Sequence, residues 1–347
     1  MLPTINEELG AYSDLFMLLA AFAYAAALVA FAWDMAKSNA TIRALEADVL
    51  AGEAKELASV GAAGSNPYAA PATGGDRPSS YQLVDDSMDY TASSAKRNVA
   101  RVAVVLTWLA AVVHLAAVLT RAVAAGRVPW GNMYEFLSTG ALFVALVYLV
   151  VLLKKDLRFM GVFVTLLVTV MLCAATMGFP TPVGHLVPAL QSYWLIIHVS
   201  IAVLSSALFT ITFVANVMQL MQHRRQSTLE ANGRDIMPFL RLVPSAGALE
   251  NLAYRINAVA FVLWTFTVMA GAIWAEHAWG RYWGWDPKEV WSFVIWVVYA
   301  GYLHARATRG WTGVRSAWLS IVGYACLIFN FTVVNIYFDG LHSYAGV

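Results

Sequence analysis

Long apolar segments dominate this sequence and constrain its fold more than any other feature. A helix needs roughly 20 apolar residues to cross the hydrocarbon core of a bilayer. Eight segments satisfy this, at about 13–33, 102–124, 135–153, 158–177, 193–221, 254–276, 288–305 and 316–338. Because 60% of the residues are hydrophobic and only 12% are charged, the composition is that of a membrane protein. The sequence therefore predicts an all-α, polytopic membrane helix bundle of about eight transmembrane helices.

The positions of Lys and Arg predict the orientation of this bundle. Basic residues in short loops accumulate on the cytoplasmic side. If the loops after the first, third, fifth and seventh segments lie inside, only Arg121, Arg127, Arg281 and Lys288 of the 22 Lys and Arg residues lie outside. Both termini and residues 274–292 are then predicted to be outside. The net charge of +1 provides no basic field for nucleic acid, and no such partner is predicted.

Three regions follow from this pattern. Residues 1–34 form an N-terminal transmembrane helix, which is retained because acidic residues rather than a basic region precede its apolar part. Residues 35–100 form a cytoplasmic loop, and its Gly-, Ser-, Ala- and Pro-rich part at 60–95 is predicted to be a flexible linker. Residues 101–347 form the main membrane domain. No role for the first 100 residues follows from the sequence.

The segment WAEHAWGRYWGWDPKEVWS, residues 274–292, joins the sixth apolar segment to the seventh on the outer side. An interfacial aromatic belt would explain one or two of its aromatic residues. A belt is spread around a bundle, however, whereas this loop concentrates them. Clustered indole rings form a flat apolar wall against which a flat aromatic ligand such as a porphyrin can stack. The cluster consists of Trp274, Trp279, Trp283, Trp285 and Trp291.

The same loop also contains signals for a turn and a helix start. Asp286, Pro287 and Glu289 have the spacing of an N-terminal capping box. Asp286 therefore has a structural interpretation beside a ligand-facing one. Gly280 and Gly284 would allow the loop to turn sharply and to bring its backbone close to a ligand.

The positions of the histidines decide whether haem is a plausible ligand. Imidazole is an axial ligand of haem iron, so two histidines on different helices at one depth are the arrangement to look for. His198, near the outer end of the fifth segment, and His342, just beyond the eighth, satisfy this on the side of the tryptophan-rich loop. An intramembrane histidine is functional by default, although a hydrogen bond to a neighbouring helix would also account for any one of them. His304, toward the inner end of the seventh segment, has no partner at its depth.

The outer loop also contains a specific signature, WGxxWxWD, formed by Trp279, Gly280, Trp283, Trp285 and Asp286. This signature is typical of the haem-handling WWD-domain proteins of cytochrome c maturation. The stretches VPWGNMYEFL, LVPALQSYWLIIHV and GLHSY favour one type within that superfamily. Over about residues 100–345 the chain resembles the CcsA (ResC) type cytochrome c biogenesis proteins of System II.

This resemblance implies a function and a set of ligands. In that family two outer histidines, here His198 and His342, ligate the iron of haem b, which is bound transiently and non-covalently. The tryptophan motif, extended here by Trp274 and Trp291, binds the haem face or edge. A deeper site includes His304 and is completed by a CcsB (ResB)-like membrane protein.

The resemblance further implies that the chain moves haem and presents it at the outer face of the bacterial cytoplasmic membrane. There, the CxxCH motif of apocytochrome c acquires thioether bonds to haem. The chain would be a subunit of a cytochrome c synthase, or haem lyase, with no nucleophile of its own. Thioredoxin-like proteins would keep the substrate thiols reduced.

Two other functions remain open from the sequence. A membrane b-type cytochrome in electron transfer would need deep histidine pairs, and only His114 and His304 are available, at unequal depths. A haem-free small-molecule transporter would leave the tryptophans as a belt, but the spans contain few charged residues for an ion relay. Cys173 and Cys326 lie far apart in apolar runs, so neither a dithiol nor a zinc site is predicted.

Overall fold

The protein consists of helices and connecting loops in the part of the chain that the structure describes. The computed structural model describes residues 5–45, 47, 51, 55, 86–88 and 97–342, and no strand occurs among them. The linker predicted at 60–95 lies outside the described residues except for 86–88. Its flexibility, and the division of the chain into three regions, therefore stay predictions.

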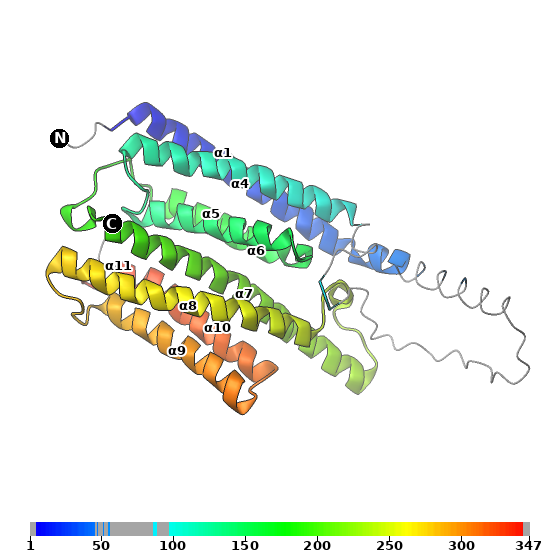
Figure 1. Cartoon of the computed structure of the whole chain (residues 1–347). Coiled ribbons are helices and arrows are strands. Elements are labelled where there is room, and N and C mark those ends of the chain that lie inside the picture. The colour runs from blue at the N-terminus through cyan, green and yellow to red at the C-terminus, as the bar shows by residue number, and fades with distance from the viewer. Residues whose placement is uncertain are drawn as a thin grey trace, which may run out of the picture.

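The main helices run side by side in one elongated bundle (Figure 1). They are α1 (Glu7–Ala36), α4 (Asn98–Ala125), α5 (Met133–Leu152), α6 (Gly161–Cys173), α7 (Tyr193–Asn232), α8 (Ala246–Trp279), α9 (Pro287–Arg309) and α10 (Val314–Phe329). Short turns of 3-10 helix lie at Arg158–Met160, Pro188–Leu190 and Pro238–Leu242. A π turn, Ala174–Gly178, ends α6, and a second π turn, Asn330–Val334, joins α10 to α11 (Asn335–Tyr337).

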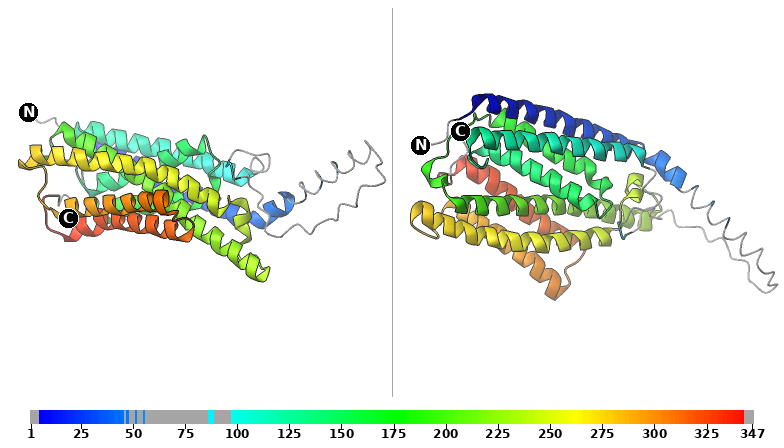
Figure 2. Two further views of the ribbon diagram at one scale, coloured as in Figure 1. Left: turned by 60° about the horizontal axis from the view of Figure 1, so that its bottom comes forward. Right: turned by 45° about the horizontal axis from the view of Figure 1, so that its top comes forward.

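Seven of the described helices are long and apolar enough to cross a membrane. The predicted polytopic helix bundle is therefore confirmed. The span predicted at 288–305 is the helix α9, which is not among the seven. Its Trp, Tyr and His residues and its terminal charges lower its hydropathy. At 23 residues and about 1.5 Å per residue, α9 is nevertheless long enough to cross, and it packs against α8 and α10 (Figure 2).

The loop 280–286 connects α8 to α9 at one end of the bundle, which is called the tryptophan end below. The beginnings of α1 and α5 and the end of α4 lie at this same end (Figure 1). The side of the membrane that this end faces stays a prediction from the Lys and Arg distribution.

Buried polar contacts fix α7, α8 and α10 relative to one another. The Ser320 hydroxyl accepts hydrogen bonds from the side-chain amides of Asn216 and Asn257, both at 2.9 Å. Thr212 donates to the Asn257 side-chain oxygen at 2.7 Å. Such interhelical hydrogen bonds contribute about 0.6–2 kcal/mol each within a membrane. The ring of Phe209 on α7 also stacks on that of Tyr299 on α9, with centroids 3.8 Å apart, so α7, α8, α9 and α10 pack as one unit.

Candidate functional site

Two neighbouring cavities lie at the tryptophan end of the bundle. The space free of protein atoms, including space open to solvent, is about 680 Å³ in the first cavity and about 600 Å³ in the second. Both cavities are lined by His198, Ala202, Lys288, Phe331 and His342. Because they share these side chains, they form two lobes of one site.

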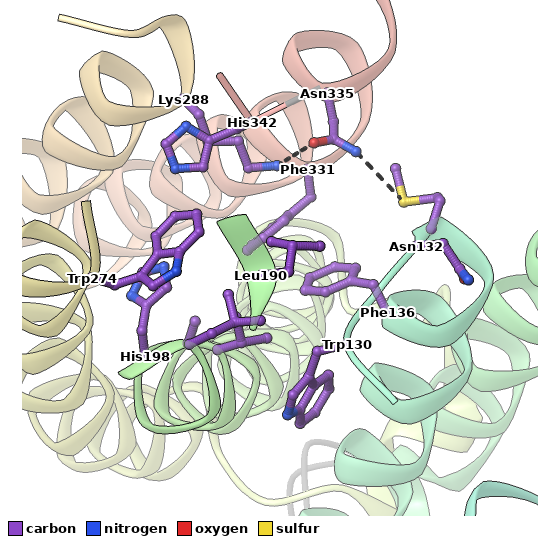
Figure 3. Close-up of a pocket in the computed structure, with 14 residues that line it drawn as sticks. Trp130, Asn132, Phe136, Leu190, His198, Trp274, Lys288, Phe331, Asn335 and His342 are labelled. Atoms are coloured by element: carbon purple, nitrogen blue, oxygen red, sulfur yellow. Dashed lines mark hydrogen bonds between the residues drawn. The ribbon is translucent and has the colours of Figure 1, made fainter. Parts of the chain in front are cut away.

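The first cavity has largely apolar walls drawn from several parts of the chain (Figure 3). Leu195, Val199 and Ala202 of α7 contribute to them. Trp130 comes from the α4–α5 loop, Phe136 from α5 and Leu190 from the 3-10 turn before α7. Trp274 comes from α8, and Phe331 comes from the C-terminal π turn. Trp283 and Tyr282 of the loop 280–286 line the second cavity instead. The site therefore offers an apolar, aromatic-walled space with few polar groups.

His198 lies on α7, where its ring nitrogens are clearly distinguished. Nδ1 is 2.9 Å from the carbonyl oxygen of Thr267 on α8. Since a carbonyl oxygen can only accept, Nδ1 carries the proton and Nε2 keeps its lone pair. The ring is nearly parallel to Trp274, at 9° with centroids 5.9 Å apart. Gly271 makes room for it, because a Cβ there would lie 2.7 Å from His198 Cε1.

His342 is held in the same way by a carboxylate. Its Nδ1 is 2.7 Å from Asp286 Oδ2, which again assigns the proton to Nδ1 and leaves Nε2 free. The backbone N–H groups of Leu341 and Lys288 also donate to this carboxylate, at 2.7 and 3.2 Å. Burial alone would raise the pKa of Asp286, but the hydrogen bonds from His342 and from the backbone N–H groups of Leu341 and Lys288 lower it. Asp286 is therefore an ionised acceptor at neutral pH.

Trp274 and Trp279 connect the two imidazoles. The centroid of Trp274 lies 5.9 Å from that of His198 and 5.5 Å from that of His342. Trp279 meets His342 edge-on at 4.9 Å. The structure thus brings His198 and His342, predicted from the sequence as a pair, into one aromatic cluster that borders both cavities.

A buried charge cluster anchors the segment 184–190, of which Leu190 lines the first cavity. Glu135 is fully buried and forms an ion pair with Arg127 at 2.8 Å. Arg127 also donates to the carbonyl oxygen of Gly184 at 2.8 and 3.0 Å. From the other side, the Trp274 indole N–H donates to the carbonyl oxygen of Ala189 at 3.2 Å. These contacts hold residues 184–190 in place beside the cavity.

The capping role predicted for Asp286 is present beside its contact with His342. The Asp286 and Glu289 side chains form a complete capping box at the start of α9. Asp286 itself lines neither large cavity. Its place in the site is therefore to orient His342, and a direct contact with a ligand stays a prediction.

Four of the residues predicted to bind the ligand do not line the cavities. Neither cavity is lined by Trp279, Gly280, Trp285 or Trp291. Gly280 ends α8 in the left-handed region, with φ of 71°. Trp285, with φ of 59°, has 73% of its surface exposed, and Trp291 packs on Phe329 of α10. Ligand contacts by these four residues stay predictions.

His304 lies away from this site. It follows Pro287 on α9 by about 25 Å along the helix axis, and it is exposed. Among the described residues its imidazole has no hydrogen bond or ring contact. The structure therefore does not bring His304 together with His198 and His342.

The donor set of the site suits a metallated macrocycle better than a bare metal ion. Among the described residues, no group of three or more His, Cys, Asp or Glu side chains could hold a metal ion. A porphyrin supplies four nitrogen ligands itself, so one or two imidazoles complete the coordination of its iron. A metal-ligating histidine ordinarily donates its other N–H to a carbonyl or carboxylate, and both His198 and His342 do so here.

These features define a class of protein: a multi-pass helical membrane protein with a two-lobed apolar cavity bordered by two oriented imidazoles. The family profile described as "Cytochrome C assembly protein" matches residues 130–342. The "Cytochrome c biogenesis protein CcsA" of Guillardia theta is 36% identical over 241 residues, which cover 65% of this chain and 79% of that protein. The proteins of the same name from Prochlorococcus marinus and Synechococcus elongatus are 34% and 33% identical, covering 65% and 63% of this chain and 78% and 80% of theirs.

The chain therefore belongs to the cytochrome c assembly protein family and is of its CcsA type. The resemblance inferred from the tryptophan signature is confirmed. Family membership assigns the chain a role in cytochrome c biogenesis.

Proposed function

We propose that the chain holds haem b transiently and non-covalently between His198 and His342 and presents it for covalent attachment to apocytochrome c. One observation carries the proposal. The two imidazoles line the same two cavities, while an acceptor engages Nδ1 of each. Each Nε2 is then available to iron, and the apolar walls exclude water from the porphyrin.

Attachment of haem to apocytochrome c requires no nucleophile from this chain, and the sequence predicts none. Each thiol of a CxxCH sequence adds across one haem vinyl group. A C–S bond forms, the thiol hydrogen goes to the other vinyl carbon, and no net oxidation occurs. The substrate histidine replaces one axial imidazole. The chain positions haem, ligates its iron and surrounds it with apolar side chains that keep water away. Thioredoxin-like proteins keep the substrate thiols reduced.

His304 belongs, in this proposal, to a second and deeper haem site. An exposed imidazole on a membrane helix is costly unless it has a polar partner, and His304 finds none among the described residues. A CcsB (ResB)-like membrane protein would supply that partner. The Lys and Arg distribution supports a tryptophan end at the outer face of the bacterial cytoplasmic membrane.

The alternative of a resident b-type cytochrome receives little support. It requires His114 and His304 to face each other. His114 is fully buried on α4 against Tyr24 of α1, whereas His304 is exposed on α9, and these helices lie at opposite sides of the bundle (Figure 1).

The proposal is tested by haem retention. The full chain is purified in detergent and its reduced and oxidised spectra are compared with those of His198→Gly and His342→Gly. We expect each variant to lose haem and added imidazole to restore it, because free imidazole fills the space of the missing ligand. His185→Gly is the matched control, since His185 is an exposed histidine near the same site that lines neither cavity. Unchanged spectra in both ligand variants would refute the proposal.

A further inference from the structure

Lys288 is a cation placed inside the apolar site. It is the second residue of α9 and lines both cavities together with His198 and His342. Figure 3 shows its side chain directed to the cavity edge, beside His342 and Asn335. The other basic residue of the segment 274–292, Arg281, lines neither cavity and lies 3.7 Å from Glu289.

The groups that hold the Lys288 ammonium are neutral. Its Nζ donates to the Asn335 side-chain oxygen at 2.8 Å and lies 4.9 Å from the centroid of the Phe331 ring. Among the described residues, no carboxylate forms a salt bridge with it. Burial disfavours the charged form of Lys288, and Asp286 favours that form at longer range. The Asp286 oxygens, however, already accept from His342, Leu341 and the Lys288 backbone.

This placement is unfavourable for the isolated chain. A cation in the first turn of a helix opposes the helix dipole, and a charge lining an apolar cavity loses hydration without a compensating ion pair. Asn335 and Phe331 orient the ammonium without neutralising it. The site therefore lacks one anionic partner on the side of Lys288, and a ligand that fills the cavities can supply it.

We propose that Lys288 binds a carboxylate on the edge of the macrocycle and so fixes which edge enters the site. This inference rests on the proposed function, because the propionates of haem are the carboxylates in question. With one acidic edge held at Lys288, rotation of the ring about the iron–imidazole axis is restricted. The vinyl edge is then directed away from Lys288, where substrate thiols must reach it. Lys288 is thus a positioning residue.

The test compares haem b with its dimethyl ester, which keeps the iron, ring and vinyl groups but has no carboxylate. Both are titrated into the full chain in detergent and followed by the Soret absorbance. The ratio of the two affinities is compared between variants, because partition of the ester into detergent then cancels. We expect Lys288→Met to lower the preference for haem about tenfold, or about 1.4 kcal/mol, with little change for the ester. Lys288→Arg should keep most of the preference.

The matched control is Arg281→Met, which removes a cation from the same loop but not from the cavity wall. It should leave the affinity ratio unchanged. Lys288→Gln provides a second neutral variant if Lys288→Met does not fold. A ratio that is unchanged in the neutral Lys288 variants, or that falls equally in Arg281→Met, would overturn the inference while leaving the histidine site intact. Failure of the wild-type chain to bind either compound would overturn the proposed function as well.

Discussion

Replacement of Gly271 by alanine tests how the site is built, because Gly271 lies against the His198 ring and lines the second cavity without a side chain of its own. A Cβ at this position would lie 2.7 Å from Cε1 and 2.9 Å from Nδ1 of His198. Carbon atoms do not approach this closely, so the imidazole must move. The hydrogen bond from Nδ1 to Thr267, at 2.9 Å, would then stretch or break.

The expected cost follows from the two effects. Overpacking costs about 1–3 kcal/mol, and loss of a buried hydrogen bond costs a similar amount when one group is left unpaired. If about 1–3 kcal/mol falls on the haem-bound state, haem affinity decreases roughly 5- to 160-fold. Gly271→Ala also gains up to about 1 kcal/mol of helix propensity, so the unfolding free energy should change less than the haem affinity does.

The assay is a haem titration of the purified chain, with Gly301→Ala as the control. Gly301 is also a helical glycine, but a Cβ there would meet no atom within 4 Å. The control should therefore bind haem as the wild type does. A Gly271→Ala variant whose haem affinity stays within twofold of that of the wild type would refute the position assigned to the His198 side chain.

Three further predictions follow from the contacts around the site. Asp286→Asn should weaken haem binding about 10- to 100-fold, as measured by titration with and without imidazole, because it removes the anion that orients His342. Since the folded-state pKa of Asp286 is lowered below its ordinary 3.8, the contribution of this carboxylate should be complete at neutral pH. This contribution should be lost only as the pH falls below 3.8 and through the folded-state pKa. Haem titrations of the wild type and of Asp286→Asn at acidic pH would detect the loss. Glu135→Gln should lower the unfolding free energy by about 3–5 kcal/mol, seen by thermal unfolding, because it removes the buried carboxylate that pairs with Arg121 and Arg127. Glu276→Gln, at a side chain that is 39% exposed, should not. His304→Gly should leave haem affinity at the tryptophan end unchanged.

The sequence predicted the helices well because their signal is local. Apolar runs of sufficient length fixed where the chain crosses the membrane, and the spacing of Asp286 and Glu289 fixed the start of α9. The exception is α9 itself, whose aromatic residues pack within the bundle although hydropathy scores them as less apolar. The pairing of His198 with His342 was also predictable, because alternating helices return to the same end of a bundle.

The side-chain arrangement within the site was not predictable, because a membrane helix that is apolar on every face gives no periodic signal for its rotation. Nothing in the sequence near Gly271 indicates that this residue would face His198. Glu135 illustrates the same limit. Asn132 caps α5, and Glu135 stands at the position where the acidic residue of a capping box would lie, but the Glu135 side chain pairs with Arg121 and Arg127.

The tryptophan motif was read correctly as a family signature, but the orientation of each ring depends on tertiary contacts. Trp283 lines a cavity, whereas Trp285 is largely exposed. The lysine in DPKE was visible in the sequence, yet only the fold reveals that its ammonium meets Asn335 rather than a carboxylate. A basic residue just inside a helix N-terminus, where the dipole disfavours it, is the signal that could have drawn attention to Lys288.

The ligation state of iron in the haem-loaded chain tests the central claim most directly. Low-temperature electron paramagnetic resonance of the ferric form should give the low-spin signal of two axial imidazoles in the wild type. In His198→Gly or His342→Gly that signal should be lost and should return on addition of imidazole. A low-spin signal that persists unchanged in both variants without imidazole would contradict the account, because the iron would then be held by other residues.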